Sequence, residues 1–134
     1  MTLPTSERIA AMSFRQVFDA ERLKRDAERR ARADAERARQ EADEARSIEL
    51  YDILAADPEF LAEKKLVLER SRYTVGLEHA DFRLRAYFED AQINVTAADK
   101  RSATTTAAPT KQQFVDSVEQ ALDVLAQYLA DETV

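Results

Sequence analysis

The chain has 134 residues, a formal net charge of −6, one glycine, three prolines and no cysteine. The lack of cysteine excludes a disulfide framework and any thiolate metal site. A single glycine leaves few positions suited to positive φ, and therefore few tight β-turns. Charged residues make up 34% of the chain, which together with the scarcity of glycine and proline favours a helix-dominated protein.

Charge and hydropathy also bear on location and partners. The first 18 residues lack a basic segment followed by an unbroken apolar one, so we expect no secretion signal and a cytoplasmic protein. Nowhere do eighteen apolar residues follow one another, so we expect no membrane span. Residues 47–99 carry 11 acidic and 6 basic side chains. Because phosphate contacts need a net basic face, we do not expect nucleic acid as a partner.

The first predicted element is a long helix. Residues 20–46 consist of alanine and charged residues apart from Leu23 and Gln40, with no glycine, proline, aromatic or β-branched residue. The helical pattern extends over residues 6–55. It ends before Pro58, because the residue that precedes a proline avoids the α region and proline suits the first position of a new helix.

Two features of this helix predict contacts with another chain. One is an apolar patch near its start, formed by Ile9, Met12, Phe14, Val17 and Phe18. The other is a stripe of alanines that step by three or four residues, including Ala31, Ala35, Ala38 and Ala42. Such a stripe can seat a second helix at close range, as in a coiled coil. The alternative is a solvated single helix whose alanines reflect helix propensity alone.

Residues 58–93 favour a second amphipathic helix. Apolar residues recur there at a spacing of three or four, among them Leu77, Leu84 and Tyr87. The same stretch also alternates with period two, as in Phe82, Leu84 and Ala86, so a short β-meander at 72–97 is the alternative. We favour the helix because the dipeptides typical of β-turns are missing.

The polar, threonine-rich residues 94–109 predict a mobile loop. A third helix is expected over residues 110–130, with Thr110 as its N-cap. Its apolar face steps by three and four residues through Val115, Val118, Leu122, Leu125 and Leu129. We expect the last four of these to form an interaction surface.

Together these elements predict an all-α protein. Residues 1–56 would form a long, charged, coiled-coil-like arm, and residues 57–134 a small helical bundle with the mobile loop at 94–109. The alternative is an α+β protein with the short β-meander at 72–97. The expected core residues are Ile53, Leu54, Phe60, Leu66, Leu77, Leu84, Leu122, Leu125 and Leu129. Because so thin a core is marginal alone, we expect a homo-oligomer, dimeric or higher.

No motif predicts chemistry. The chain has neither GxxxxGK[ST] nor GxGxxG, and its single glycine cannot build a phosphate-binding loop. His79 is the only histidine, whereas a di-metal carboxylate bundle needs two Glu-x-x-His pairs. We expect no catalytic residue, metal or cofactor, and therefore no enzyme.

Two functions fit these features. The first is a non-enzymatic scaffold or adaptor that acts through self-association and protein contacts, for example as an accessory component of a phage-like or secretion-like assembly. The alternative is a regulatory binding module that holds a partner helix or a small ligand between the helices predicted at 58–93 and 110–130.

Overall fold

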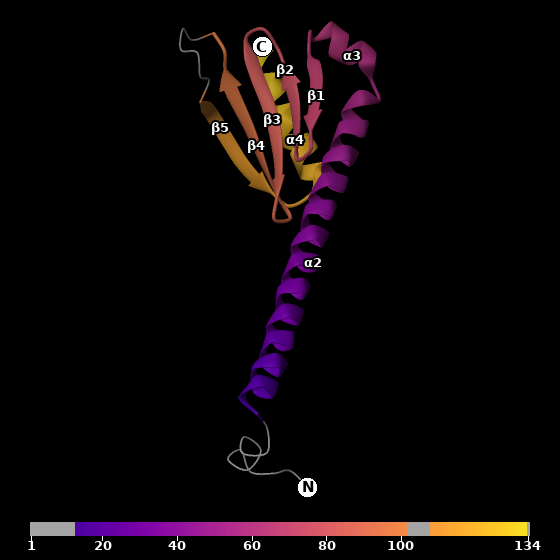
Figure 1. The fold of residues 1–134 in the computed structure, drawn as a ribbon. Coiled ribbons are helices and arrows are strands. Elements are labelled where there is room, and N and C mark those ends of the chain that lie inside the picture. The colour runs from indigo at the N-terminus through magenta and orange to yellow at the C-terminus, as the bar shows by residue number, and fades with distance from the viewer. Residues whose placement is uncertain (1–12, 102–107, 134) are drawn as a thin grey trace. The chain divides into compact units, whose positions relative to one another are not determined.

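The computed structural model describes residues 13–101 and 108–133. It contains three helices and five strands within these residues (Figure 1): α2 (Phe14–Ala55), α3 (Pro58–Glu63), β1 (Val67–Ser71), β2 (Thr74–Glu78), β3 (Phe82–Glu89), β4 (Gln92–Asp99), β5 (Pro109–Val115) and α4 (Val118–Glu132). The strands form one antiparallel meander in the order β1-β2-β3-β4-β5. The chain divides into two compact units, Met1–Ala38 and Arg39–Val134.

The all-α prediction, and with it the helical bundle, is wrong. An α+β architecture with a meander, the alternative, describes the protein better. The helix predicted over residues 58–93 is the short helix α3 followed by β1, β2 and β3. The predicted loop at 94–109 contains most of β4, and the helix predicted from Thr110 begins with β5 instead.

Strand β3 shows why the period-two pattern prevails. Its residues alternate without exception between buried and more exposed positions, from Phe82 to Glu89. Leu84 pairs with Leu77 of β2 and with Ala97 of β4, so it is fully buried between two apolar neighbours. A period-two alternation is what a half-buried strand requires. The helix-like spacing of three or four in residues 58–93 arises because apolar residues of several consecutive strands were read as one pattern.

The turn between β3 and β4 is built without glycine. Asp90 and Ala91 connect the paired residues Glu89 and Gln92 and adopt positive φ values of 50° and 65°. Two-residue hairpin turns of this kind need positive φ at both positions. The side chain of Asp43 accepts hydrogen bonds from both backbone N–H groups, at 3.0 and 3.1 Å. A tertiary contact thus holds a turn that the missing turn dipeptides seemed to exclude.

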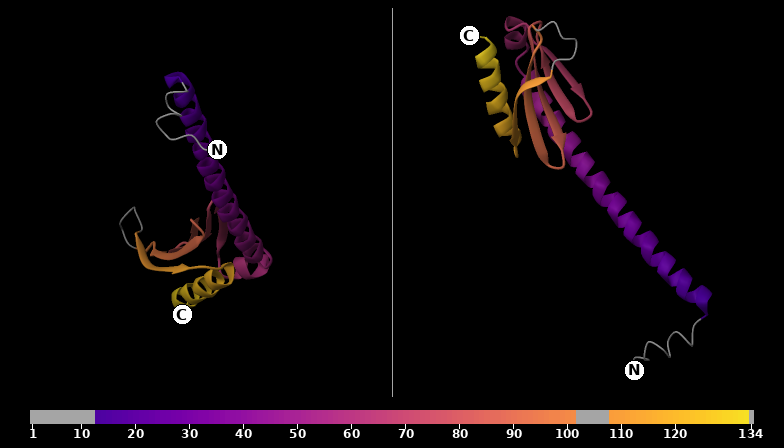
Figure 2. Two further views of the ribbon diagram at one scale, coloured as in Figure 1. Left: turned by 90° about the horizontal axis from the view of Figure 1, so that it is seen from below. Right: turned by 90° about the vertical axis from the view of Figure 1, so that its left-hand side faces the viewer.

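The core of the second unit lies between the sheet and the helices. Helix α4 covers one face of the sheet (Figure 2), and Leu50 of α2 is buried in the same cluster. Of the predicted core residues, Leu66, Leu77, Leu84 and Leu125 are buried, whereas Leu54, Leu122 and Leu129 are partly buried. Ile53 and Phe60 remain exposed.

Local capping sets where two helices begin. At the start of α2, the N–H of Gln16 donates to Ser13 Oγ at 3.2 Å and the N–H of Ser13 donates to Gln16 Oε1 at 3.0 Å. This reciprocal pair is a capping box. In α4 the N-cap is Ser117, which accepts from the N–H of Gln120 at 3.1 Å. The prediction that Thr110 caps this helix is wrong, because Thr110 lies in β5.

The described part of the first unit, residues 13–38, is a segment of α2 with exposed side chains apart from the half-buried Asp26. Ion pairs one turn apart support it, including the Glu21–Arg25 pair at 3.3 Å. The predicted helical residues 6–12 lie outside the described residues. Within the described chain, no helix has the length and hydropathy that crossing a membrane requires.

Candidate functional site

An apolar groove lies between the end of α2, helix α3 and helix α4. Its volume is about 390 Å³, a size typical of ligand-binding clefts. The large apolar side chains of Ile53 and Phe60 remain 43% and 41% exposed there. The lining residues are Ile53, Leu54, Asp57, Phe60, Leu61, Lys64, Leu66, Leu77, Leu122, Leu125, Ala126, Leu129, Ala130 and Thr133. Of these residues, Leu66, Leu77 and Leu125 are buried, whereas the large apolar side chains of Ile53 and Phe60 are exposed to solvent in the described chain.

Helix α3 forms one wall of the groove because both of its ends are fixed by local bonds. The Asp57 side chain accepts from the N–H of Phe60 at 3.1 Å, and Pro58 occupies the first helical position. At the other end Lys65 adopts φ 57°, and the N–H of Leu66 returns to the carbonyl of Leu61 at 2.8 Å. The chain therefore leaves α3 directly into β1.

The helices beside the groove are acidic. Helix α3 carries two acidic residues and no basic one, and α4 carries four acidic residues and no basic one. Asp131 and Glu132 are paired with Lys111 and Arg101, at 2.9 and 3.0 Å. Asp123 on the same helix is exposed. The surroundings of the groove therefore favour a basic partner.

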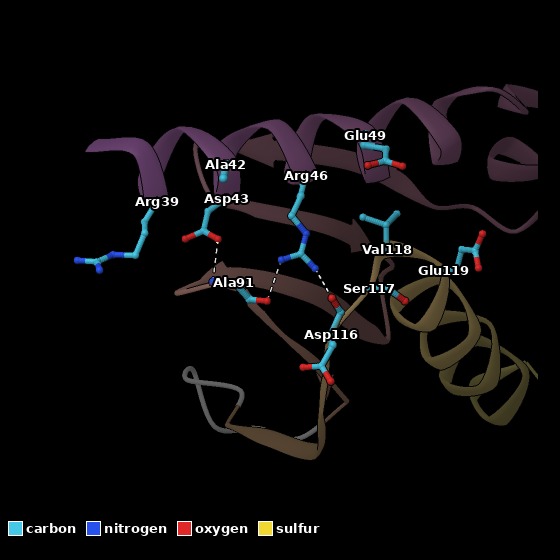
Figure 3. A pocket seen from close by; sticks show the side chains of 10 residues that line it. All are labelled: Arg39, Ala42, Asp43, Arg46, Glu49, Ala91, Asp116, Ser117, Val118 and Glu119. Atoms are coloured by element: carbon cyan, nitrogen blue, oxygen red, sulfur yellow. Dashed lines mark hydrogen bonds between the residues drawn. The ribbon is translucent and has the colours of Figure 1, made fainter. Parts of the chain in front are cut away.

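A second hollow, of about 620 Å³, lies where α2 meets the β3–β4 turn and the start of α4 (Figure 3). Two of its charged side chains, those of Asp43 and Arg46, bind backbone atoms of the protein itself (Figure 3). Asp43 binds the N–H groups of Asp90 and Ala91, while Arg46 donates to the carbonyl of Ala91 at 2.8 Å and to that of Asp116. These two side chains connect α2 to the β3–β4 turn and to the segment before α4. We therefore interpret this hollow as a structural contact that stabilises the fold, and not as a ligand site.

The β1–β2 turn is held by the same helix. Ser47 is fully buried, and its hydroxyl shares its single proton between the carbonyl of Glu44 on its own helix, at 2.7 Å, and the carbonyl of Arg72, at 3.0 Å. The guanidinium of Arg72 donates to Glu44 at 3.2 Å. The prediction of a coiled-coil-like arm over residues 1–56 did not assign residues 43–47 a contact with the body of the protein. Their spacing with Leu50 at intervals of three and four was the signal that this helix face packs against the body.

The face of the sheet opposite α4 carries a charge cluster. Glu78 of β2 contacts Arg83, Arg85 at 3.4 Å and Lys100 at 3.2 Å. Burial raises the pKa of Glu78, but hydrogen bonds from Arg83 and Lys100 outweigh this effect, and the net pKa is lowered from 4.5. Three cations surround one carboxylate, so the cluster has an excess of positive charge on an acidic protein.

The side chain of His79 is held by contacts within the protein. Its ring stacks on Phe82 with 4.4 Å between centroids, and its Nδ1 accepts from the N–H of Asp81 at 3.0 Å. Among the described residues, no group of three or more histidine, aspartate or glutamate side chains is arranged to hold a metal ion.

The predicted interaction residues fall into three groups. Phe14, Val17 and Phe18 are exposed on α2, at 86%, 38% and 54%, and Ile9 lies outside the described residues. The alanines Ala31, Ala35, Ala38 and Ala42 are exposed on α2. On α4, Val118 and Leu125 are buried against the sheet, and Leu122 and Leu129 are partly buried. Only Leu122, Leu125 and Leu129 line the apolar groove; Phe60 and Ile53 were expected in the core instead.

The fold places the protein in the α+β class, as an antiparallel meander with helices packed on one face. Comparison with protein-family models, with curated proteins and with solved structures gives no significant match in any of the three.

Proposed function

We propose that the protein is a non-enzymatic binding module whose apolar groove holds an amphipathic helix of a partner protein. The observation that carries this proposal is the uncovered groove of about 390 Å³ between α3 and α4. It corresponds to the alternative drawn from the sequence, with α3 in place of the helix expected at 58–93. Helix-in-groove recognition uses apolar side chains at intervals of three and four residues.

The charge around the groove specifies the partner further. Asp131 and Glu132 of α4 are balanced by Lys111 and Arg101, and Lys64 also lines the groove, but Glu59 and Glu63 of α3 and Asp123 of α4 add a net negative charge to the two helices. A partner helix with lysine or arginine flanking its apolar face would be attracted and oriented by this field. An acidic helix of equal hydrophobicity would be repelled.

The test uses two labelled synthetic helices with leucine at positions i, i+3, i+4 and i+7, one carrying lysine and the other glutamate elsewhere. Fluorescence anisotropy with the full chain should show saturable binding of the lysine helix alone. Ala126→Arg, in the groove wall, should abolish it, while Gln127→Arg on the neighbouring exposed position should not. Equal binding to both variants, or no binding of the lysine helix, would contradict the proposal.

Self-association is a second candidate function, favoured by the exposed patch of Phe14, Val17 and Phe18. These residues stand at i, i+3 and i+4 and form one apolar face of α2. Light scattering over a concentration series should show an oligomer that Phe18→Ser dissociates and that Asp19→Ser, at the neighbouring exposed position, leaves intact. A monomer at every concentration would exclude this candidate.

The cytoplasm stays the proposed location, to be checked by cell fractionation.

A further inference from the structure

The open face of the sheet, opposite α4, is defined by the strand register. Glu69, Gly76, Arg85 and Thr96 lie in one row across β1 to β4, because each is the direct partner of the next. Thr74, Tyr87, Asn94 and Phe114 lie in the neighbouring row across β2 to β5. Directly paired residues share a face of an antiparallel sheet. Two hollows occur on this face, one on each side of Tyr87.

The first hollow, of about 440 Å³, is lined by two arginines, Arg70 and Arg85, against one acid, Glu69, and by three hydroxyl side chains. Arg85 reaches it together with Ser71, Thr74 and Tyr87, and Gly76 adds no side chain. Arg85 makes two hydrogen bonds, to Tyr87 and Glu78, both at 3.4 Å. A guanidinium has five N–H groups. Donors therefore remain for a carboxylate, which arginine binds through two parallel N–H bonds.

The second hollow, of about 550 Å³, has the opposite character. Glu89 and Asp90 line it with Asn94, and the rings of Tyr87 and Phe114 stand beside Asn94 on either neighbouring strand. Asn94 Oδ1 is buried and has no hydrogen-bond partner within the described residues. Buried acceptors normally have a donor. The lining suits a cationic donor, which acids attract and aromatic faces also stabilise.

We propose that the open face of the sheet is a second binding site, which takes an extended peptide segment bearing a carboxylate and, two residues further on, a lysine. The carboxylate binds Arg85 in the first hollow. The lysine ammonium enters the second hollow, donates to Asn94 Oδ1 and lies near Glu89 and Asp90.

The spacing of the site agrees with this ligand. Arg85 lies two residues before Tyr87 on β3, and Tyr87 is paired with Asn94 on β4. With about 3.3 Å per residue along a strand and about 4.8 Å between strands, the Cα atoms of Arg85 and Asn94 are about 8 Å apart. In an extended peptide, side chains at i and i+2 point to the same side and stand about 7 Å apart. Adjacent side chains point to opposite sides and cannot fill both hollows.

The test compares two labelled peptides of identical composition, Thr-Glu-Thr-Lys-Thr and Thr-Thr-Glu-Lys-Thr, titrated with the full chain at low ionic strength. We expect the first to bind roughly tenfold more tightly, the effect of losing one ion pair. Asn94→Leu should weaken binding of the first peptide to the level of the second, as should Arg85→Gln. Gln113→Leu, an amide-to-leucine change on the other face of the sheet, should have no effect.

Weaker binding by Asn94→Leu would not be due to unfolding, because the substitution removes an unpaired buried acceptor. The melting temperature of this variant should equal that of the parent protein. Ala126→Arg separates this site from the groove: it should lose the lysine helix and keep this peptide. Equal affinity for the two peptides, or unchanged binding by Asn94→Leu, would overturn the proposal. Competition by inorganic phosphate that Asn94→Leu does not alter would indicate a bare anion site and overturn it as well.

Discussion

Asp90 and Ala91 carry the backbone through the β3–β4 turn at positive φ, where a residue with a Cβ atom is strained. For an L-residue this conformation costs about 1–2 kcal/mol. Ala91→Gly should therefore raise the free energy of unfolding by about 1 kcal/mol, as measured by urea denaturation. The same substitution in a helix, Ala126→Gly, should lower it by about 1 kcal/mol. Destabilisation by both changes would refute this account of the turn.

Glu78 links stability to pH. Its pKa in the folded protein lies below 4.5 because Arg83 and Lys100 donate hydrogen bonds to it, with Arg85 also in contact. A group with a depressed pKa stabilises the folded state above its unfolded pKa and loses this contribution as the pH falls through its folded pKa.

The parent should therefore be more stable than Glu78→Gln at pH 6, and the difference should shrink as the pH is lowered from about 4.5. Chemical denaturation of both proteins between pH 6 and pH 3 provides the measurement. Glu69→Gln, a change at an exposed glutamate of β1, serves as the control. A difference that is constant across this range would show that the carboxylate is not held by these cations.

At the scale of elements, the last turns of α2 act as a clamp on the ends of two hairpins. The carboxylate of Asp43 accepts two backbone N–H groups, and such charge-assisted bonds stabilise folded proteins by about 1.5–3 kcal/mol. Asp43→Ala should lower the free energy of unfolding by about 2–3 kcal/mol. Glu41→Ala, an exposed position on the same helix, should change it by less than about 0.5 kcal/mol. Equal small effects would mean that the turn holds itself.

Element type was only partly predictable. The long helix follows from local propensity, because alanine and paired charges favour helix without tertiary help. In residues 58–93 the apolar side chains recur both at the helical spacing of three or four and at the strand spacing of two. Residue propensity alone did not decide between helix and strand. Leu122, Leu125 and Leu129, which the sequence placed on one apolar helix face, line the apolar groove, but their role as an interaction surface stays a prediction. The charge cluster of Glu78 was not, because its members come from separate strands.

At the scale of the whole molecule, the buried residues of the described chain begin at Asp43. The residues before Arg39 belong to the first unit, whose described side chains are almost all exposed. A chain that starts at Arg39 should therefore keep the β-sheet signal in circular dichroism and unfold cooperatively. Its free energy of unfolding should fall by at most about 1 kcal/mol, because the shortened helix has no N-cap. Loss of the cooperative transition would show that the first unit is needed for folding.

By itself, the sequence determined the long helix of α2, the amphipathic face of α4, and the absence of disulfides, since each depends on residue types close in the chain. Tertiary structure decided the rest. Asp43 and Arg46 hold a glycine-free turn, and Leu84 is buried only because Leu77 and Ala97 pair with it on both sides. Strand pairing joins residues distant in sequence, so the choice between helix and sheet depended on partners that no local pattern contains.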